Sequence, residues 1–251
     1  MKRLLLIFGL FLILPLTTHA TLIVNPGFED QSYSLGFNPG STGLWFGDYV
    51  EFVSEHNGIT PYEGETMLRF VSTTTSSAAS TVRSDVWQFI DLSAYAPEIA
   101  SGLLSVQGSA YVNRIGDDLA GSDVLINTMF EFDLFAFSGD FSTFLTQFYA
   151  QTYLESERVS LLSSPYEWQM LSFSMAIPAM TDFLAIHISA TENVNNYLSG
   201  IEFHGHYADA ITLNFLPIDP SPAPVPEPST LLLLGFGMLG LAGLKKRFFK
   251  E

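Results

Sequence analysis

The chain of 251 residues contains no cysteine, so disulfide bonds, thiol catalysis and cysteine metal sites are excluded. Positive charge is also scarce. Between Thr21 and Val225 there is no lysine, and only Arg69, Arg83, Arg114 and Arg158 stand against 24 acidic residues. Most of such a surface would repel nucleic-acid phosphates and anionic lipid headgroups. An apolar fraction of 47% nevertheless supplies a proper core, which excludes a disordered acidic tail.

The remaining basic residues lie at the two ends of the chain. Lys2 and Arg3 precede an apolar run from Leu4 to Leu14, which is too short to span a bilayer comfortably. Small residues follow, and they suit a peptidase that cuts after Ala20. This pattern predicts a secretory signal peptide over residues 1–20. A buried N-terminal helix is the alternative.

The C-terminal end changes composition abruptly. Alternate prolines punctuate residues 217–225, and each removes an amide donor, so we expect an extended linker there. Thr230 to Leu244 is uncharged and apolar, and it runs into a basic cluster over 245–250. A helix of that length rises about 22 Å, short of a bilayer core of about 30 Å. The cluster places its end in the cytoplasm, which predicts a marginal membrane anchor.

The order of these C-terminal parts resembles a known sorting signal. Val225-Pro226-Glu227-Pro228-Ser229-Thr230, an apolar helix and a basic terminus are similar to the PEP-CTERM signal that exosortase recognises. The resemblance implies a Gram-negative envelope protein, held in the inner membrane by residues 226–251. It also implies cutting near Pro226, Glu227 and Pro228, then delivery to the cell surface or a biofilm matrix of exopolysaccharide. An ordinary anchor that is never processed is the alternative.

Alternating apolar and polar residues dominate the central region. Such a period of two predicts β-strands with one buried face. The predicted strands are 82–90, 103–114, 126–137, 171–177, 184–188 and 211–215. A weak helical pattern is confined to Thr143–Arg158. Many short strands can bury their apolar faces only against one another, so we expect an all-β antiparallel sandwich over residues 21–216.

The order of motifs in this region resembles the galactose-binding-like jelly rolls of carbohydrate-binding modules. It starts at Asn25-Pro26-Gly27-Phe28-Glu29 and continues through Pro61-Tyr62-Glu63-Gly64 and Trp168-Gln169-Met170-Leu171-Ser172. It closes at Tyr207-Ala208-Asp209-Ala210-Ile211. The stretch from Asp140 to Ser164 has no clear counterpart and departs from the pattern. The resemblance implies a jelly-roll β-sandwich.

A structural calcium ion is a further implication of this resemblance. The acid after Asn-Pro-Gly-Phe and the aspartate of the last strand commonly help to hold it, and here these are Glu29 and Asp209. Calcium takes several oxygen ligands, which carbonyls from turns near Glu63 and Gly64 would complete. The alternative is that Glu29 caps a turn and Asp209 is solvated.

A sugar site needs an aromatic surface beside groups that form paired hydrogen bonds to hydroxyls. If Ala110 and Val112 face the core, alternation places Tyr111 on the outer face, and the same argument exposes Glu131 and Asp133 on the next strand. These three residues form the predicted ligand-binding patch. An ordinary solvated sheet face is the alternative.

One other motif carries less chemistry. His204 and His206 would point to one face of a strand, but no third ligand is evident, so we favour a turn before the last strand. The nucleophile elbow, the phosphate loop and the dinucleotide fingerprint are all missing from the sequence.

The sequence therefore predicts an exported, non-catalytic β-sandwich that binds exopolysaccharide or another glycan. A structural or adhesive surface protein without glycan specificity is the second hypothesis. A glycan-cleaving enzyme is the third, and it would need two opposed carboxylates in a cleft.

Overall fold

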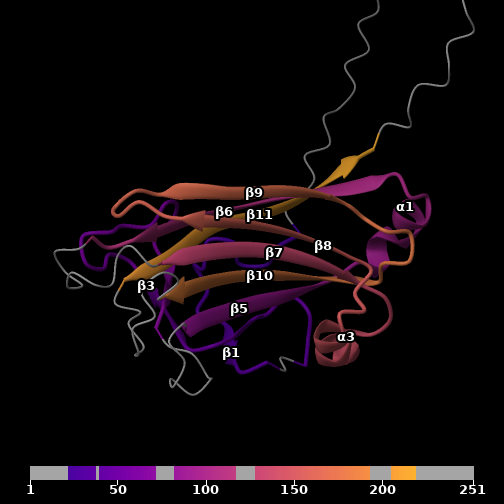
Figure 1. Cartoon of the computed structure of the whole chain (residues 1–251), viewed down its shortest axis with the longest axis horizontal. Helices are drawn as coiled ribbons and strands as arrows, with labels where there is room; N and C mark the ends of the chain where they lie inside the picture. The colour runs from indigo at the N-terminus through magenta and orange to yellow at the C-terminus, as the bar shows by residue number, and fades with distance from the viewer. Residues whose placement is uncertain (1–21, 38–39, 72–81, 117–127, 193–204, 219–251) are drawn as a thin grey trace, which may run out of the picture. The chain divides into compact units, whose positions relative to one another are not determined.

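The computed structural model describes residues 22–37, 40–71, 82–116, 128–192 and 205–218 (Figure 1). The chain divides into two compact units, residues 1–216 and 217–251, and the β-sandwich belongs to the first. The predicted signal peptide, the Pro-Glu-Pro motif and the C-terminal apolar helix lie outside the described residues. Among the described residues, no helix is long and apolar enough to cross a membrane.

Two sheets form the sandwich. The six-stranded sheet has the order β1 (Tyr33–Leu35), β2 (Trp45–Gly47), β5 (Val82–Asp91), β10 (Phe183–Glu192), β7 (Met129–Phe137) and β8 (Glu155–Leu162). The five-stranded sheet has the order β3 (Val50–Val53), β4 (Met67–Phe70), β11 (His206–Pro217), β6 (Leu104–Arg114) and β9 (Gln169–Ala176). The central β10 pairs antiparallel with β5 and β7, whereas β1 and β2 pair in parallel. The molecule is thus the predicted all-β jelly-roll sandwich.

The main core lies between the two sheets, and strand alternation fills it. On β7, the side chains of Phe130, Phe132 and Leu134 are fully buried against the opposite sheet. Val106, Ala110 and Val112 do the same from β6. Each fully buried Val, Leu or Phe side chain contributes about 1.5–3 kcal/mol of hydrophobic free energy.

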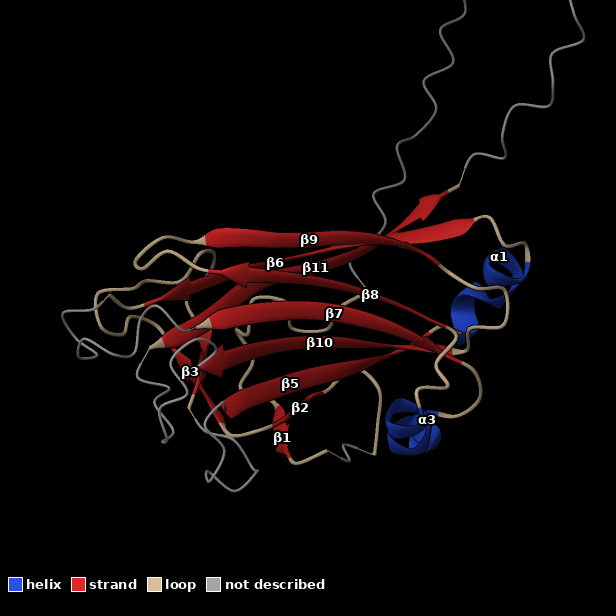
Figure 2. Cartoon of the chain, viewed as in Figure 1, coloured by secondary structure: helices blue, strands red, loops and turns tan. Residues whose placement is uncertain are grey.

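A second apolar layer covers part of the outer face of the six-stranded sheet. It is built by η2 (Phe141–Thr143) and α3 (Phe144–Ala150), whose aromatic rings pack on Trp87, Phe89 and Phe137. In the part of the chain that the structure describes, the other helical segments are η1 (Ser93–Tyr95) and α1 (Ala96–Ala100). Figure 2 shows α1 and α3 at the same end of the sandwich.

The strand predictions for the central region are confirmed, with bounds that differ by a few residues. The weak helical prediction over Thr143–Arg158 holds only as far as Ala150. From Glu155 the chain is strand β8, which pairs antiparallel with β7. Half of that stretch was therefore predicted wrongly, because β8 is an edge strand with few buried side chains and so has a weak period of two.

Candidate functional site

Three carboxylates converge beside Gly27. A Cβ atom placed on this glycine would lie 3.7 Å from Glu29 Oε1, from Glu63 Oε1 and from Asp209 Oδ1. The first and last parts of the sandwich thus meet here, as the sequence predicts for Glu29 and Asp209. Glu63, which we expected to contribute only through its turn, brings a third carboxylate.

Backbone amides orient two of these carboxylates. Asp209 is fully buried, so it is not solvated, and its Oδ2 accepts hydrogen bonds from Tyr62 N at 2.8 Å and Glu63 N at 3.2 Å. Glu29 Oε1 accepts from Glu65 N at 2.9 Å and from Thr66 N at 3.2 Å. The Pro61–Thr66 turn is therefore held between the two carboxylates.

Gly64 is required at the centre of that turn. Its φ of +68° lies in the left-handed region, and a Cβ there would stand 1.9 Å from Glu29 Oε1. Strain accumulates around the same carboxylates, because the non-glycine residues Asn25, Phe28 and Ala210 have φ of 53°, 59° and 49°. Such residues cost on the order of 1–3 kcal/mol each and persist where the surroundings impose them.

The electrostatics of this carboxylate cluster bear on whether a cation could bind there. Burial raises the pKa of Asp209 to about 6, three backbone N–H donors oppose the rise, and the charge of Glu63 adds to it. Oxygen atoms from carboxylates and turns are the donors that calcium prefers. Among the described residues, no three His, Asp or Glu side chains have the spacing of a metal site. Three carboxylates repel one another without a cation between them, and a hard cation would draw them together.

The predicted patch of Tyr111, Glu131 and Asp133 does not form as one surface. Tyr111 lies on β6 of the five-stranded sheet, whereas Glu131 and Asp133 lie on β7 of the six-stranded sheet. Consecutive strands enter different sheets here, so the two outer faces point in opposite directions. The prediction that these strands adjoin is therefore wrong, although alternation placed each side chain on an outer face.

Glu131 and Asp133 are buried in a network of charges rather than exposed. Arg83 and Arg158 both contact Glu131, and Arg158 Nε lies 2.7 Å from Asp133 Oδ1. His187 is 1% exposed, with Nδ1 at 2.8 Å from Asp133 Oδ2 and Nε2 at 2.8 Å from Asp85 Oδ1. The carboxylates are already paired, which leaves them little capacity to bind a ligand.

Tyr111 belongs instead to an aromatic cluster on the outer face of the five-stranded sheet. The tyrosine platform, as we name it, consists of Tyr62, Tyr111, Trp168 and Met170. Tyr62 stacks on Tyr111 with ring centroids 3.6 Å apart and planes inclined by 15°. The Trp168 ring meets the Tyr62 ring edge-on, with the two centroids 6.1 Å apart. Met170 is the cross-strand neighbour of Tyr111. Tyr62 and Met170 remain 44% and 55% exposed, so the platform faces solvent.

The carboxylate cluster and the tyrosine platform are directly connected. Asp209 Oδ2 accepts a hydrogen bond of 2.8 Å from the backbone amide of Tyr62, which is itself part of the platform. Trp168 is also fixed to this loop, because its Nε1 donates to Thr60 O at 3.0 Å. The hydroxyl of Tyr62 hydrogen-bonds Tyr111, which raises the pKa of Tyr62. Any change that loosens the carboxylates should therefore loosen the aromatic surface.

Sequence reasoning missed the roles of Tyr62, Glu63 and Trp168. All three belong to motifs that the sequence analysis singled out, Pro61-Tyr62-Glu63-Gly64 and Trp168-Gln169-Met170, but nothing local indicates that two loops meet over Tyr111. His204 lies outside the described residues, while His206 begins β11 and lies 2.8 Å from Thr128 Oγ1 rather than in a turn.

Comparison with known proteins identifies one segment of the chain. The family model of the PEP-CTERM protein-sorting motif matches residues 224–247, so the chain carries this motif at its C-terminal end. The match agrees with the resemblance of Val225–Thr230 and the segments after it. No curated protein matches the chain.

Several solved structures are similar to the sandwich. TmCBM61, solved with β-1,4-galactotriose, is 13% identical, with a TM-score of 0.42, over 79% of this chain and 99% of that chain. The CBM22-2 xylan-binding domain of Paenibacillus barcinonensis Xyn10C is 14% identical, with a TM-score of 0.39, over 71% and 95%. A family 16 carbohydrate-binding module is 14% identical, with a TM-score of 0.38, over 77% and 99%. At these values, the two sheets themselves remain the basis of the fold assignment.

Proposed function

We propose that this chain is an exported surface or matrix protein, processed by exosortase, whose non-catalytic β-sandwich binds a glycan at the tyrosine platform. The sorting motif over residues 224–247 supports export and delivery to the cell surface. The single observation that carries the binding role is the solvent-facing ring of Tyr62, braced on Tyr111 at 3.6 Å.

The platform suits a sugar because it combines a flat apolar surface with hydrogen-bonding edges. An aromatic ring held by a second ring loses little conformational freedom when a pyranose face packs on it. The Ser109 and Thr212 hydroxyls, 2.7 Å apart on the same sheet face, supply donors and acceptors beside it.

Charge limits the class of glycan. The segment from Thr21 to Val225 has 24 acidic residues and four arginines. Two of those arginines, Arg83 and Arg158, are committed to Glu131 on the opposite sheet. A neutral glycan is therefore favoured, and an acidic one would need a bridging cation.

The proposal includes a structural calcium ion bound by the carboxylates of Glu29, Glu63 and Asp209. It would neutralise the three carboxylates and keep the Tyr62 turn in place, because Asp209 accepts the Tyr62 amide. Glycan binding should then weaken on chelation even though no sugar contacts the ion.

The test is glycan-array and affinity-electrophoresis binding of the exported protein, with and without calcium. Tyr62→Ala should lower affinity about tenfold or more, equivalent to about 1.4 kcal/mol. The matched control is Tyr149→Ala, which removes a 79% exposed tyrosine from α3 and should bind like the wild type.

A structural or adhesive protein without glycan specificity is the alternative function. Failure of the wild-type protein to retain any polysaccharide, in calcium and in chelator, would favour that alternative. Equal binding by wild type and Tyr62→Ala would instead move the site away from the platform.

A further inference from the structure

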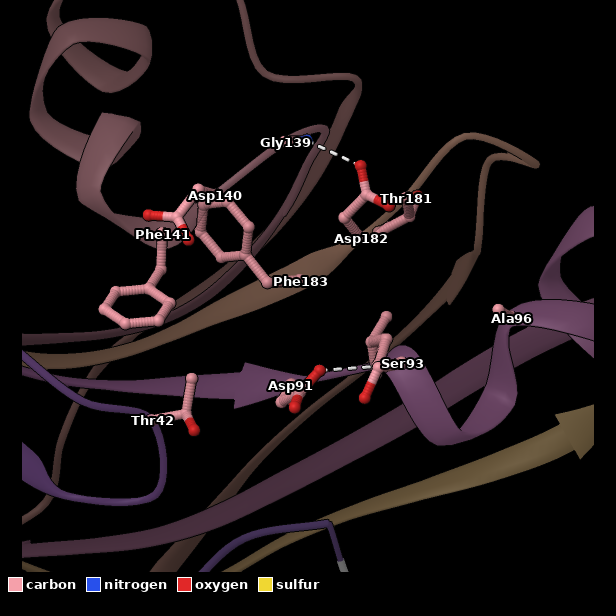
Figure 3. Close-up of a pocket in the computed structure, with 11 residues that line it drawn as sticks. Thr42, Asp91, Ser93, Ala96, Gly139, Asp140, Phe141, Thr181, Asp182 and Phe183 are labelled. Carbon is pink, nitrogen blue, oxygen red and sulfur yellow. Dashed lines mark hydrogen bonds between the residues drawn. The ribbon is translucent and has the colours of Figure 1, made fainter.

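A cavity of about 490 Å³ opens at the end of the sandwich where η1 and η2 lie. It is separate from the tyrosine platform and shares no residue with it. Figure 3 shows residues from the ends of β5 and β10 and from the turn after β7 around one space. Its lining includes Asp91, Ala96, Asp140, Phe141, Asp182 and Phe183.

Aromatic side chains give the cavity an apolar wall. Phe183 is 3% exposed, and it is fixed by stacking on Phe137 at 5.0 Å and by edge contact with Phe89 at 5.8 Å. Phe141 is half-buried beside it and packs on Phe89 at 6.0 Å. A wall of rigid rings is a feature of organic-ligand pockets, and a site that holds only a metal ion does not require one.

The polar groups are oriented before any ligand arrives. One carboxylate oxygen of each aspartate accepts a backbone amide: Asp91 from Ser93 at 2.8 Å, Asp140 from Ser142 at 2.8 Å and Asp182 from Gly139 at 2.6 Å. The second oxygen of each carboxylate can accept a hydrogen bond from a hydroxyl group. Carboxylates accept hydrogen bonds only, so their partners must be donors such as sugar hydroxyls.

The charge and the size of the cavity narrow the chemical class of its ligand further. Among the described residues that line the cavity there is no lysine, arginine or histidine, so the three aspartates would repel a uronate or a sulfated sugar. The volume lies within the range of about 300–1,000 Å³ that is usual for small-molecule sites.

We propose that this cavity binds a neutral sugar residue and forms a second glycan subsite. The proposal rests on the glycan-binding function proposed above. Tyr111 lies near the end of β6, whereas α1 and the cavity lie where β6 begins, so the two sites are at opposite ends of the sandwich. A chain with two such sites can bridge two polysaccharide strands, which makes the exported protein a cross-linker of neutral glycan.

The experiment counts bound sugars on the full exported protein. Neutral hexasaccharides of mannose, galactose, glucose and xylose are titrated by calorimetry, with an oligogalacturonate as the acidic probe. Ala96→Trp fills the cavity from an exposed helix position, and Asp140→Asn keeps the turn acceptor but removes the charge. The control Asp30→Asn alters a similar exposed turn, where Asp30 accepts the Ser32 amide at 3.1 Å.

We expect a stoichiometry of two for the wild type and Asp30→Asn, and of one for Ala96→Trp and Tyr62→Ala. Asp140→Asn should weaken sugar binding only at the cavity, which is the site that remains in Tyr62→Ala. A wild-type stoichiometry of one, abolished by Tyr62→Ala and unchanged by Ala96→Trp, would overturn the second subsite and leave the platform standing. No binding of any probe would defeat the proposed function itself. Equal binding of the oligogalacturonate in Tyr62→Ala would contradict a neutral ligand.

Discussion

Asp209 joins the carboxylate cluster to the tyrosine platform through one atom, Oδ2, which accepts the amides of Tyr62 and Glu63. A ligand that binds only the folded state stabilises it by mass action, by about 2.7 kcal/mol at 100 times its dissociation constant. We therefore expect Asp209→Ala and Glu29→Ala to lower the melting temperature chiefly when calcium is present. Scanning calorimetry in calcium and in chelator measures both values.

The control for this prediction is Glu55→Ala, which removes an exposed acid from the neighbouring loop. It should leave the calcium-dependent increase in melting temperature intact. Equal losses in calcium and in chelator for Asp209→Ala would count against a metal at this position and would assign Asp209 a purely structural role.

His187 makes stability depend on pH. A neutral imidazole donates through one nitrogen only, whereas carboxylate oxygens face both nitrogens of His187 at 2.8 Å, so the geometry favours the imidazolium. Burial alone would lower the pKa of His187, but its hydrogen bonds to Asp133 and Asp85 raise it above the ordinary value. A raised folded-state pKa gives stability that is complete below about pH 6.5 and is lost as the pH rises through the raised value.

The corresponding measurement is urea unfolding from pH 6 to pH 9. The wild type should lose stability as the pH rises above about 6.5 and through the raised pKa of His187. His187→Gln should remove that slope, although it lowers stability at pH 6. Asp209 also has a raised pKa, of about 6, so its effect falls mainly between about pH 4 and pH 6 and ends near about pH 7. The slope due to His187 is therefore read from about pH 7 upward. Parallel curves for wild type and His187→Gln would show that His187 is not charged.

At the scale of elements, α3 acts as a cover for the six-stranded sheet. Phe144 is 2% exposed. Its ring centroid lies 5.3 Å from that of Trp87, 4.8 Å from that of Phe89 and 5.5 Å from that of Phe137. Replacing a buried phenylalanine by alanine leaves a cavity and costs about 3–5 kcal/mol. We expect Phe144→Ala to lower the free energy of unfolding in urea by that amount.

The exposed Tyr149 on the same helix provides the comparison, and Tyr149→Ala should change the free energy of unfolding by about 0.5 kcal/mol or less. If Phe144→Ala does not fold, Phe144→Leu gives a smaller loss that can be measured. Similar values for Phe144→Leu and Tyr149→Ala would mean that α3 does not stabilise the sheet.

The sequence predicted elements well where one strand face is buried. In β7, Phe130, Phe132 and Leu134 face the main core and alternate with Glu131 and Asp133, whose ion pairs occupy the other face. The short strands β1 to β4 have three or four residues, too few for a period of two to show. Alternation gives the face of a side chain but not the sheet of its strand, and this is why Tyr111 was grouped with Glu131. Sheet membership depends on pairings between distant residues, such as β10 with β5.

The same limit applies to the candidate site. Glu29 and Asp209 were predicted from a motif resemblance, and the structure brings them together at Gly27. The platform could not be predicted, because Tyr62 reaches Tyr111 only after the Pro61–Thr66 turn is fixed by two carboxylates that are far apart in the sequence, Glu29 and Asp209.

At the scale of the whole molecule, the charge distribution and the sorting motif act together. The chain has a net charge of −16, yet Lys245, Lys246, Arg247 and Lys250 cluster at its C-terminal end. A basic end favours the cytoplasmic side of a membrane, while the acidic sandwich is compatible with release from an anionic surface. Cutting within the matched segment would separate these two parts.

Replacing Pro226, Glu227 and Pro228 by alanine should therefore retain the full-length chain in the inner-membrane fraction of a host with exosortase. Wild type should instead appear outside the cell with residues after the cut missing, as intact-mass measurement would show. Pro220→Ala and Pro222→Ala, which lie outside the matched residues 224–247, should be released like the wild type. In a host without exosortase the wild type should behave as the triple variant does. Release of a shortened triple variant from the exosortase host would show that another peptidase frees the sandwich without the Pro-Glu-Pro motif. Retention of the full-length wild type in the membrane fraction of that host would instead indicate an ordinary anchor that is never processed.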